Sequence, residues 1–323
     1  MLSTELTRAL GIEHPIIQAG MGGEAGPALA AAVSNAGALG SMGSIGVPPG
    51  RLREMIAQCR EATARPWALN VVTFESAPFA AEALDVALEA RPPVLTLSFG
   101  DSVPAIRRAQ DAGIPVIAQV QDFAAARRVL AERPAAIIVQ GNEAGGHTGT
   151  RGTLSFAAQV LEVAGDVPVV IAGGVANGRG LAAALAMGAA GVVMGTRFKA
   201  TEEFAGSSTQ KQAIAASSGD NTDAAEVFDA PYPIQWPPGV VGRAMKSRFS
   251  EEWRGREAEL REKAASLPPF ALVGELSRSP ETEINWAGES SGLVEAILPA
   301  GEVVRRTVAQ AEELLARLAA VRA

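Results

Sequence analysis

The sequence predicts an α/β fold, a (β/α)8 barrel of the TIM type with a smaller, mostly helical insertion after the eighth strand. Two observations lead to this prediction: eight short apolar runs recur along the first two-thirds of the 323 residues, and Ala-rich stretches with helical spacing separate them. Continuous apolar runs are typical of parallel strands that are buried on both faces. An open, doubly wound sheet usually has five or six strands, so eight strands favour a closed barrel, and the open sheet stays as the alternative.

The expected strands are short, and small or polar residues follow most of them. They span residues 15–18, 38–42, 68–73, 94–98, 116–120, 136–140, 168–172 and 191–194. The helices between them have apolar residues three or four positions apart and often begin after Ser, Asp or Asn, as helix caps require. They span residues 26–36, 48–62, 77–89, 103–112, 122–132, 155–164 and 179–187. Loops at the carboxyl ends of such strands form the site in this fold, so chemistry is expected there.

The regular alternation stops after the eighth strand. Polar turns, a Pro-rich stretch and a charged helix over residues 250–265 follow. We therefore expect two domains, a barrel formed by residues 1–203 and 286–323 and a cap formed by residues 204–285. A periodic helix over residues 303–321 would complete the barrel.

The composition excludes several classes of function. With 28 basic and 35 acidic side chains the formal net charge is −7, which argues against a nucleic-acid partner. The single cysteine, Cys59, excludes an intrachain disulfide and Cys-based clusters, and two histidines exclude a three-His site, so we expect no metal. The N-terminus lacks a signal-peptide pattern and no apolar run is long enough to span a membrane, so we expect a cytoplasmic protein.

Glycines at the ends of two expected strands form the strongest local signal. Gly173 and Gly174 follow the seventh strand, and Gly195 follows the eighth. Glycine lets backbone N–H groups approach a phosphate closely, and the loops after strands seven and eight are a frequent phosphate site in such barrels. The alternative is that these glycines only terminate strands. The segment from Gly20 to Gly22 does not fit the dinucleotide-binding fingerprint, and we expect it to lie against a flat cofactor ring.

One histidine stands where chemistry is expected. His147 lies in the Gly-rich segment after the sixth strand, a segment that begins at Gln140 and includes Gly145 and Gly146. An imidazole there can take or give a proton near neutral pH, which makes His147 the candidate general acid or base. The alternative is a turn histidine that backbone groups satisfy. His14 enters the first strand at the opposite end of the barrel, where we expect a structural role.

With these elements placed, the chain resembles the nitronate monooxygenase family, formerly called 2-nitropropane dioxygenases, which are FMN-dependent (β/α)8 barrels. The matching segments run in family order and cover most of the chain: HPIIQAGM at 14–21, AAVSNAG at 31–37, LN at 69–70, EAGGH at 143–147, AGG at 172–174, MGTRF at 194–198, WAG at 286–288 and GL at 292–293. The EAGGH segment is the most specific of them.

The resemblance implies a set of FMN-binding residues. Gly20, Met21 and Gly22 would lie along the flavin ring, and Asn70 and Gln119 would reach its polar edge. The ribityl phosphate end would be held by Gly146, Gly173, Gly174, Gly195 and Thr196. The cofactor site would be completed by Gln140, Gly145 and Met194.

By the same resemblance, the protein would oxidise alkyl nitronates or nitroalkanes with O2 to carbonyl compounds and nitrite. His147 would remove the α-proton of a nitroalkane or position a nitronate, while FMN carries the redox chemistry. The expected partners are this small-molecule substrate and O2, with no nucleic acid and no membrane, and a homodimer is one expectation for the assembly. Two alternatives stay open: an FMN-dependent enoyl-acyl-carrier-protein reductase or another NAD(P)H-dependent FMN reductase, and a non-catalytic flavin binder.

Further residues carry secondary expectations. Some family members have a lysine where this chain has Gln119, so a positive charge near the flavin would come here from Arg197 or from a helix N-terminus. Lys199, at the expected start of the cap, would meet solvent, and Cys59 would pack outside the barrel. Three tryptophans would form the core of the cap or, alternatively, a lid over the substrate: Trp236, Trp253 and Trp286.

Overall fold

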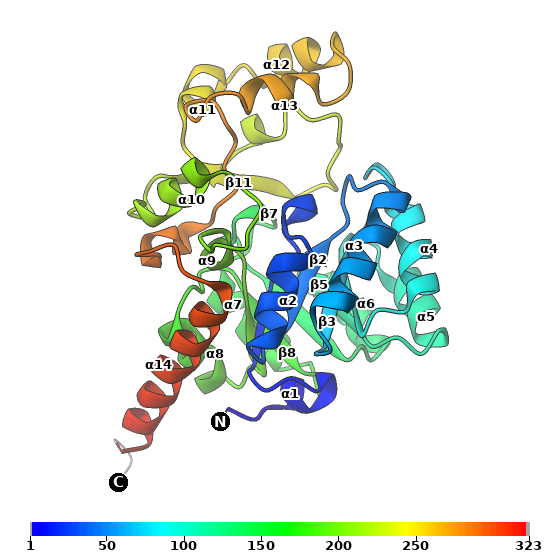
Figure 1. Ribbon diagram of the computed structural model, residues 1–323, viewed down its shortest axis with the longest axis vertical. Helices are drawn as coiled ribbons and strands as arrows, with labels where there is room; N and C mark the ends of the chain where they lie inside the picture. The colour runs from blue at the N-terminus through cyan, green and yellow to red at the C-terminus, as the bar shows by residue number, and fades with distance from the viewer. Residues whose placement is uncertain (1, 321–323) are drawn as a thin grey trace.

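The computed structural model describes residues 2–320 and contains eight parallel strands arranged as a barrel (Figure 1). The barrel strands are β1 (Ile16–Gln18), β2 (Gly40–Gly43), β3 (Trp67–Thr73), β4 (Val94–Gly100), β5 (Val116–Val120), β6 (Ala136–Gln140), β8 (Val169–Ala172) and β9 (Gly191–Met194). They pair in the order β1-β9-β8-β6-β5-β4-β3-β2. A parallel bridge between Ile17 and Leu39 brings β1 back beside β2 and nearly closes the ring. The predicted (β/α)8 barrel is confirmed.

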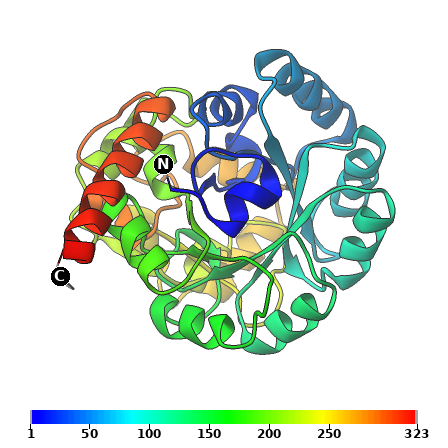
Figure 2. The same cartoon turned by 90° about the horizontal axis from the view of Figure 1, so that it is seen from below.

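Helices surround the strands on the outside (Figure 2). They are α2 (Pro27–Asn35), α3 (Pro49–Ala62), α4 (Ala80–Ala90), α5 (Val103–Asp111), α6 (Phe123–Ala131), α7 (Thr153–Leu161), α8 (Gly178–Ala186) and α14 (Ala300–Ala320). Asp122 and Asn177 cap α6 and α8, because their side-chain oxygens accept hydrogen bonds from N–H groups of the first turn. α14 begins at Ala300 and not at the expected residue 303, and its expected end at residue 321 lies outside the described residues.

Two layers of apolar side chains hold these elements together. The larger layer lies between strands and helices and includes Leu52, Ile56 and Cys59, which share one face of α3. The smaller layer fills the barrel interior and includes Leu6 and Leu10 of α1 (Glu5–Leu10), the helix that covers the lower end of the barrel (Figure 2). Cys59 therefore packs outside the barrel, as expected. Because α1 covers one end of the barrel, the other end is the one that a ligand can reach.

Residues 204–285, called the cap from here on, lie over the carboxyl end of the barrel (Figure 1). Its helices are α10 (Ser208–Ala215), the 3-10 turn η2 (Glu226–Phe228), α11 (Arg248–Trp253), α12 (Glu257–Ala265) and α13 (Ala271–Leu276). The single charged helix expected over residues 250–265 is wrong, because Gly255 adopts a φ of 79° between α11 and α12. The cap has a small apolar core of its own, built around Phe228 and Phe249. The division of the chain into two domains stays a prediction.

A three-stranded antiparallel sheet, which no pattern in the sequence predicts, joins the cap to the barrel. β7 (Gly146–Thr148) comes from the segment after β6, whereas β10 (Thr222–Ala224) and β11 (Val241–Met245) belong to the cap. The strands pair in the order β10-β11-β7, and Gly242 lies opposite His147. The segment around His147 is therefore partly a strand that is bound to the cap.

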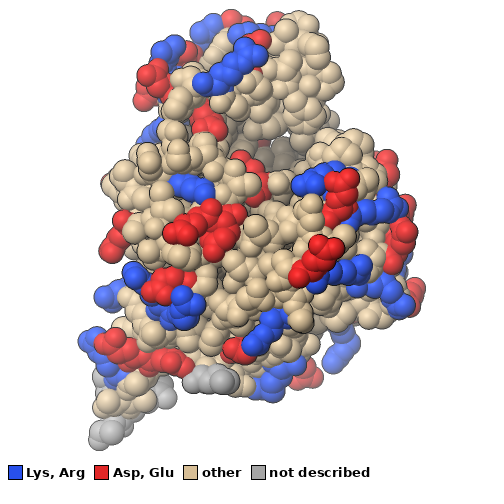
Figure 3. Space-filling model, viewed as in Figure 1, with Lys and Arg blue, Asp and Glu red and all other residues tan. Residues whose placement is uncertain are grey.

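The surface carries both signs of charge. On the face seen in Figure 3, Lys and Arg side chains are mixed with Asp and Glu, and the surface is hollowed between the cap and the barrel. Such a mixture produces no large field of one sign. Across residues 2–320, no helix combines the length and the apolar character that crossing a membrane requires.

Candidate active site

A cavity of about 380 Å³ lies at the carboxyl end of the barrel, beneath the cap. This volume is in the range of small-molecule and cofactor sites. Strand ends and loops of the barrel line most of the cavity, and the cap contributes Tyr232, Ile234, Trp236, Phe270 and Ile284. Of the site residues expected from the sequence, the cavity brings together Gly20, Met21, Gly22, Asn70, Gln119, Gln140, Gly145, Gly146, His147, Gly173, Gly174, Gly195 and Thr196.

Met194 is the expected site residue that the cavity does not include. Its side chain is fully buried in the layer between strands and helices. Successive side chains of a strand point to opposite faces, so Val193 lines the cavity and Met194 points away from it. Only the backbone of Met194 comes near the site, where its carbonyl oxygen accepts a hydrogen bond from the N–H group of Ala19 at 3.0 Å.

Residues 20–24, called the β1 loop from here on, form one wall of the cavity and approach the neighbouring strands very closely. A Cβ atom on Gly20 would lie 2.6 Å from Cβ of Asn70, and a Cβ atom on Gly43 would lie 2.0 Å from the carbonyl oxygen of Gly22. No side chain fits at either glycine without moving its neighbours. Met21 adopts a left-handed φ of 43°. The loop therefore presents a small-residue surface, against which a flat ring could lie.

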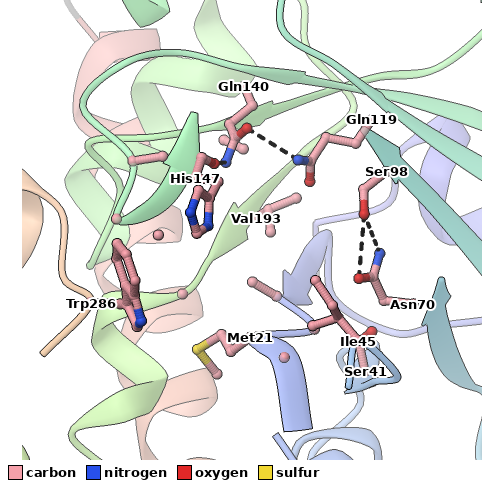
Figure 4. A pocket seen from close by; sticks show the side chains of 18 of the residues that line it. Met21, Ser41, Ile45, Asn70, Ser98, Gln119, Gln140, His147, Val193 and Trp286 are labelled. Atoms are coloured by element: carbon pink, nitrogen blue, oxygen red, sulfur yellow. Dashed lines mark hydrogen bonds between the residues drawn. The ribbon is translucent and has the colours of Figure 1, made fainter. Parts of the chain in front are cut away.

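Amide side chains form two separate hydrogen-bonded groups in the cavity wall (Figure 4). Nδ2 of Asn70 donates to Oγ of Ser98 at 3.1 Å. Nε2 of Gln119 donates to Oε1 of Gln140 at 3.1 Å, and Nε2 of Gln140 donates to the carbonyl oxygen of His147 at 3.0 Å. The second group holds the backbone of His147, and both groups can present amides to a ligand.

The cap holds the imidazole of His147. Nε2 lies 2.5 Å from Oδ1 of Asp229, whose other oxygen accepts a hydrogen bond from the N–H group of Gly242 at 3.2 Å. A carboxylate only accepts hydrogen bonds, so Nε2 carries a proton in this pair, and in a neutral imidazole Nδ1 then has the free lone pair. The ring of Trp236 stacks on the imidazole with centroids 3.4 Å apart, and that of Trp286 lies 4.8 Å away. The ring is thus fixed in position and tautomer, which suits a proton acceptor.

Glycines at the ends of β8 and β9 line the cavity beside Thr196. Gly173 and Gly174 have φ values of 106° and 75°, and a Cβ atom on Gly174 would lie 2.2 Å from Oε2 of Glu143. Thr196 begins the short helix α9 (Thr196–Lys199), and its Oγ1 accepts a hydrogen bond from the N–H group of Gly288 at 2.9 Å. Since that contact uses only a lone pair, the hydroxyl hydrogen can reach an anion. Glycines next to a hydroxyl suit a phosphate group.

Among the described residues that line the cavity, Lys199 is the one Lys or Arg, and it was expected to meet solvent. It is 3% exposed, and its Nζ lies 3.5 Å from Oε2 of Glu24. Burial lowers the pKa of Lys199, and the nearby Glu24 and Glu283 act against that shift. Arg197, one expected source of positive charge, donates instead to the carbonyl oxygen of Ala296 and does not line the cavity. The expectation that Lys199 meets solvent is wrong. Of the two expected sources of positive charge, Arg197 does not reach the cavity, and the helix N-terminus stays a prediction.

Sequence reasoning missed most of what the cap contributes. Asp229 lies 82 positions from His147 and belongs to no motif, so no local pattern indicates the pair. Trp236 and Trp286 line the cavity and fit the lid alternative, although Trp286 also packs against the cap core; Trp253 packs against that core and does not line the cavity. Their place in or beside the expected cap was the cue to both alternatives.

The cavity wall contains polar groups that a cofactor could use. Oγ1 of Thr96 is buried, lines the cavity and has no hydrogen-bond partner. The amides of Asn70 and Gln119 can pair with the polar edge of a flavin ring, and the glycines near Thr196 can approach its phosphate. Within residues 2–320, no three His, Cys, Asp or Glu side chains are grouped so as to hold a metal ion.

A family model and two solved structures match this chain over nearly its whole length. The family model described as nitronate monooxygenase matches residues 3–310. FabK from Thermotoga maritima has a structure with a TM-score of 0.89 and 32% identity, covering 99% of this chain and 100% of that one. Nitroalkane oxidase from Streptomyces ansochromogenes has a TM-score of 0.82 and 28% identity, covering 98% and 100%.

A further relative matches a shorter stretch at higher identity. It is the (3aS,4S,5R,7aS)-5-hydroxy-7a-methyl-1-oxo-octahydro-1H-indene-4-carboxyl-CoA dehydrogenase of Rhodococcus jostii, which is 40% identical over 202 residues. The match covers 62% of this chain and 56% of the relative, so the chain spans little more than half the length of that dehydrogenase.

Proposed function

The chain belongs to the nitronate monooxygenase family of flavin-dependent oxidoreductases, and from this premise we propose that it oxidises alkyl nitronates and nitroalkanes with O2 to carbonyl compounds and nitrite, with FMN as its cofactor. The observation that carries the proposal is the pair formed by His147 and Asp229, 2.5 Å apart at the wall of a glycine-rich cavity. A glycine-rich wall suits a flat ring, and a fixed imidazole suits proton transfer beside it.

FMN, when bound, would supply the redox chemistry, and the chain would supply position and one titrating group. We infer that Gly20, Met21 and Gly22 lie along the ring. The polar edge would face Asn70, Gln119 and Gln140, and the ribityl phosphate end would meet Gly145, Gly146, Gly173, Gly174, Gly195 and Thr196. Met194 would contribute only through its carbonyl oxygen, which holds Ala19 at the start of the β1 loop.

His147 would act at Nδ1. With a neutral nitroalkane, this nitrogen takes the proton from the α-carbon, and Asp229 stabilises the resulting imidazolium through the Nε2–H group. An anionic nitronate has already lost that proton, so His147 would then only position it. Trp236 and Trp286 pack against the imidazole and limit the access of water to it.

Replacing His147 with alanine tests this proposal. We expect H147A to retain FMN, because the imidazole is not part of the glycine-rich wall. Turnover of a neutral nitroalkane should fall by about 10²- to 10⁴-fold, the usual contribution of a general base, while turnover of a preformed nitronate falls much less. His14→Ala is the matched control, since it removes the other of the two histidines. Unchanged nitroalkane turnover in H147A would contradict the assignment of the base.

A second candidate is the reduction of a carbon–carbon double bond in an acyl thioester with NAD(P)H, as in the flavin-dependent enoyl-acyl-carrier-protein reductases. Two observations favour it: the 32% identity with FabK exceeds the 28% identity with nitroalkane oxidase, and the 40% identical relative is named as a dehydrogenase of a CoA compound. Rapid mixing without oxygen separates the candidates. Flavin bleaching by an alkyl nitronate without a response to NADPH supports nitronate oxidation, and rapid bleaching by NADPH supports the reductase.

A further inference from the structure

The β1 loop, residues 20–24, forms a wall of the cavity in a conformation that needs outside support. Met21 and Gly22 both have a left-handed backbone, with φ values of 43° and 59°. Glycine adopts this conformation freely, but methionine does so only where the surrounding contacts hold it. Figure 4 shows Met21 across the open space from His147, so a shift of the loop would change the distance between two walls of the site.

Very few polar contacts supply that support. In the described part of the chain, residues 20–24 make no hydrogen bond to another element; only the flanking residues do. The N–H group of Ala19 donates to Met194, and the N–H group of Gly43 donates to the carbonyl oxygen of Ala25 at 3.3 Å. The polar contact that ties the loop itself to another element is the ion pair between Glu24 and Lys199.

Lys199 depends on this contact in turn. Its Nζ is buried and has no hydrogen-bond partner, and the ring of Phe204 lies 5.3 Å away. Oε2 of Glu24, at 3.5 Å, is the acidic atom within ion-pair distance, and Glu283 adds a weaker electrostatic attraction. A buried ammonium group is costly unless an anion stays close to it. The arrangement is therefore favourable only while Glu24, and with it the loop, remains in place.

We propose that Lys199 is a positioning residue: through the carboxylate of Glu24 it holds the β1 loop in the conformation that forms the cofactor-facing wall of the cavity. Lys199 is well placed for this because α9 is itself fixed, with Oγ1 of Thr196 bonded to the N–H group of Gly288. The expected effect of this ion pair on flavin binding rests on the proposed function. Its expected effect on the loop conformation requires no ligand.

Hydrogen exchange of the full chain without added flavin tests the effect on the loop. We expect Lys199→Met and Glu24→Gln each to raise the hydrogen-exchange rate of the amides of residues 20–24 by about tenfold. This change lies between the effect of losing an exposed ion pair and that of losing a buried one. The double variant should exchange no faster than either single variant, because both break the same contact. Lys211→Met is the control: this half-buried lysine of α10 donates to the carbonyl oxygen of Glu202 and does not contact the loop.

FMN titration of the same variants tests the consequence for the cofactor. The dissociation constant should rise about tenfold in each single variant and no further in the double variant. The melting temperature of Lys199→Met should stay within a few degrees of that of the wild type, because methionine replaces a buried charge with an apolar group of similar size, whereas that of Glu24→Gln should fall, because the buried ammonium group loses its anion. Unchanged loop exchange in Lys199→Met would overturn the proposal. So would weaker FMN binding in Lys199→Met with unchanged or tighter binding in Glu24→Gln, because Lys199 would then bind an anion directly. If the wild type binds no FMN, the proposed function fails, and the exchange experiment still decides whether Lys199 holds the β1 loop.

Discussion

The barrel side and the cap side of the cavity are built in different ways. The barrel side consists largely of backbone, because glycines occupy the strand ends and the β1 loop and small amides stand between them. The cap side consists of large side chains such as Tyr232, Trp236 and Phe270, together with the carboxylate of Asp229 behind the imidazole. The barrel therefore determines where a flat ligand can lie, whereas the cap determines what surrounds its reacting end.

His147 connects the two sides. It follows the barrel strand β6, yet its own strand β7 pairs with β11 of the cap. Gln140 of the barrel holds its backbone, and Asp229 of the cap holds its imidazole. We therefore expect substitutions on the barrel side to change cofactor binding and substitutions on the cap side to change turnover.

The largest effect is expected on the barrel side, from Gly43→Ala. The new Cβ atom would lie 2.0 Å from the carbonyl oxygen of Gly22 and 2.3 Å from that of Gly20, so the β1 loop must move. We expect the FMN affinity, measured by fluorescence titration, to fall by about 10³-fold or more, which corresponds to roughly 4 kcal/mol. Gly26→Ala is the control, because an added Cβ atom there has no neighbour within 4 Å. Wild-type FMN affinity in G43A would show that this wall does not bind the cofactor.

A smaller but still large effect is expected on the cap side, from Asp229→Asn. The amide can no longer stabilise an imidazolium, and it allows the other tautomer of His147. We expect kcat for a neutral nitroalkane to fall by about 10²- to 10³-fold while the dissociation constant for FMN stays within twofold. Asp223→Asn removes another cap carboxylate, one that pairs with Arg254 at the surface, and should leave both quantities unchanged. Loss of FMN from D229N would contradict the separation between the two sides.

The barrel side could be predicted from the sequence because its signals are local. Each strand ends in a short pattern of glycines or amides, and the fold brings these ends together at one edge, so Gly173, Gly174 and Gly195 reach the cavity with Asn70 and Gln119. Met194 was expected in the site but does not line the cavity, because side chains alternate along β9. A one-residue difference decides whether a strand residue faces the cavity or the surrounding helices.

The cap side could not be predicted, because its contacts are long-range. No pattern near Asp229 indicates that β11 will pair with β7 and bring this carboxylate to His147. Lys199 looked solvent-exposed because a charged side chain is normally solvated, and only tertiary packing buries it near Glu24. The helix expected over residues 250–265 is interrupted because Gly255 has a left-handed φ, which apolar periodicity does not show.

Trp236 offers a finer test of the cap side, because it packs against the barrel as well as against the imidazole. Its ring lies 4.8 Å from that of Phe74 and 5.0 Å from that of Phe99, in addition to the stack on His147. An aromatic pair contributes about 0.5–1.5 kcal/mol beyond its buried area, so we expect Trp236→Phe to lower kcat/KM by about three- to tenfold. Trp253→Phe, in the cap core, should change kcat/KM less than twofold. Equal effects of the two substitutions would mean that the cap acts only through its stability.

The smallest effect concerns the barrel alone. Cys59 is fully buried, and burial raises the pKa of its thiol from 9.0 to about 12. Above pH 9 the unfolded chain therefore loses a proton that the folded chain keeps. The free energy of unfolding must fall as the pH rises through this range, and the thiol accounts for roughly 1 kcal/mol of that fall at pH 10.

Cys59→Ala removes this contribution. Urea unfolding at pH 7.5 and at pH 10 should show that the wild type loses roughly 1 kcal/mol more than C59A between the two pH values. The variant should be less stable at both pH values, because a buried side chain is shortened, yet its turnover at pH 7.5 should stay within twofold of wild type. A sharp loss of turnover would mean that strain in the layer around α3 reaches the cavity. We thus expect a barrel residue to report on folding without changing the chemistry, and substitutions of Asp229 and Trp236 in the cap to change it.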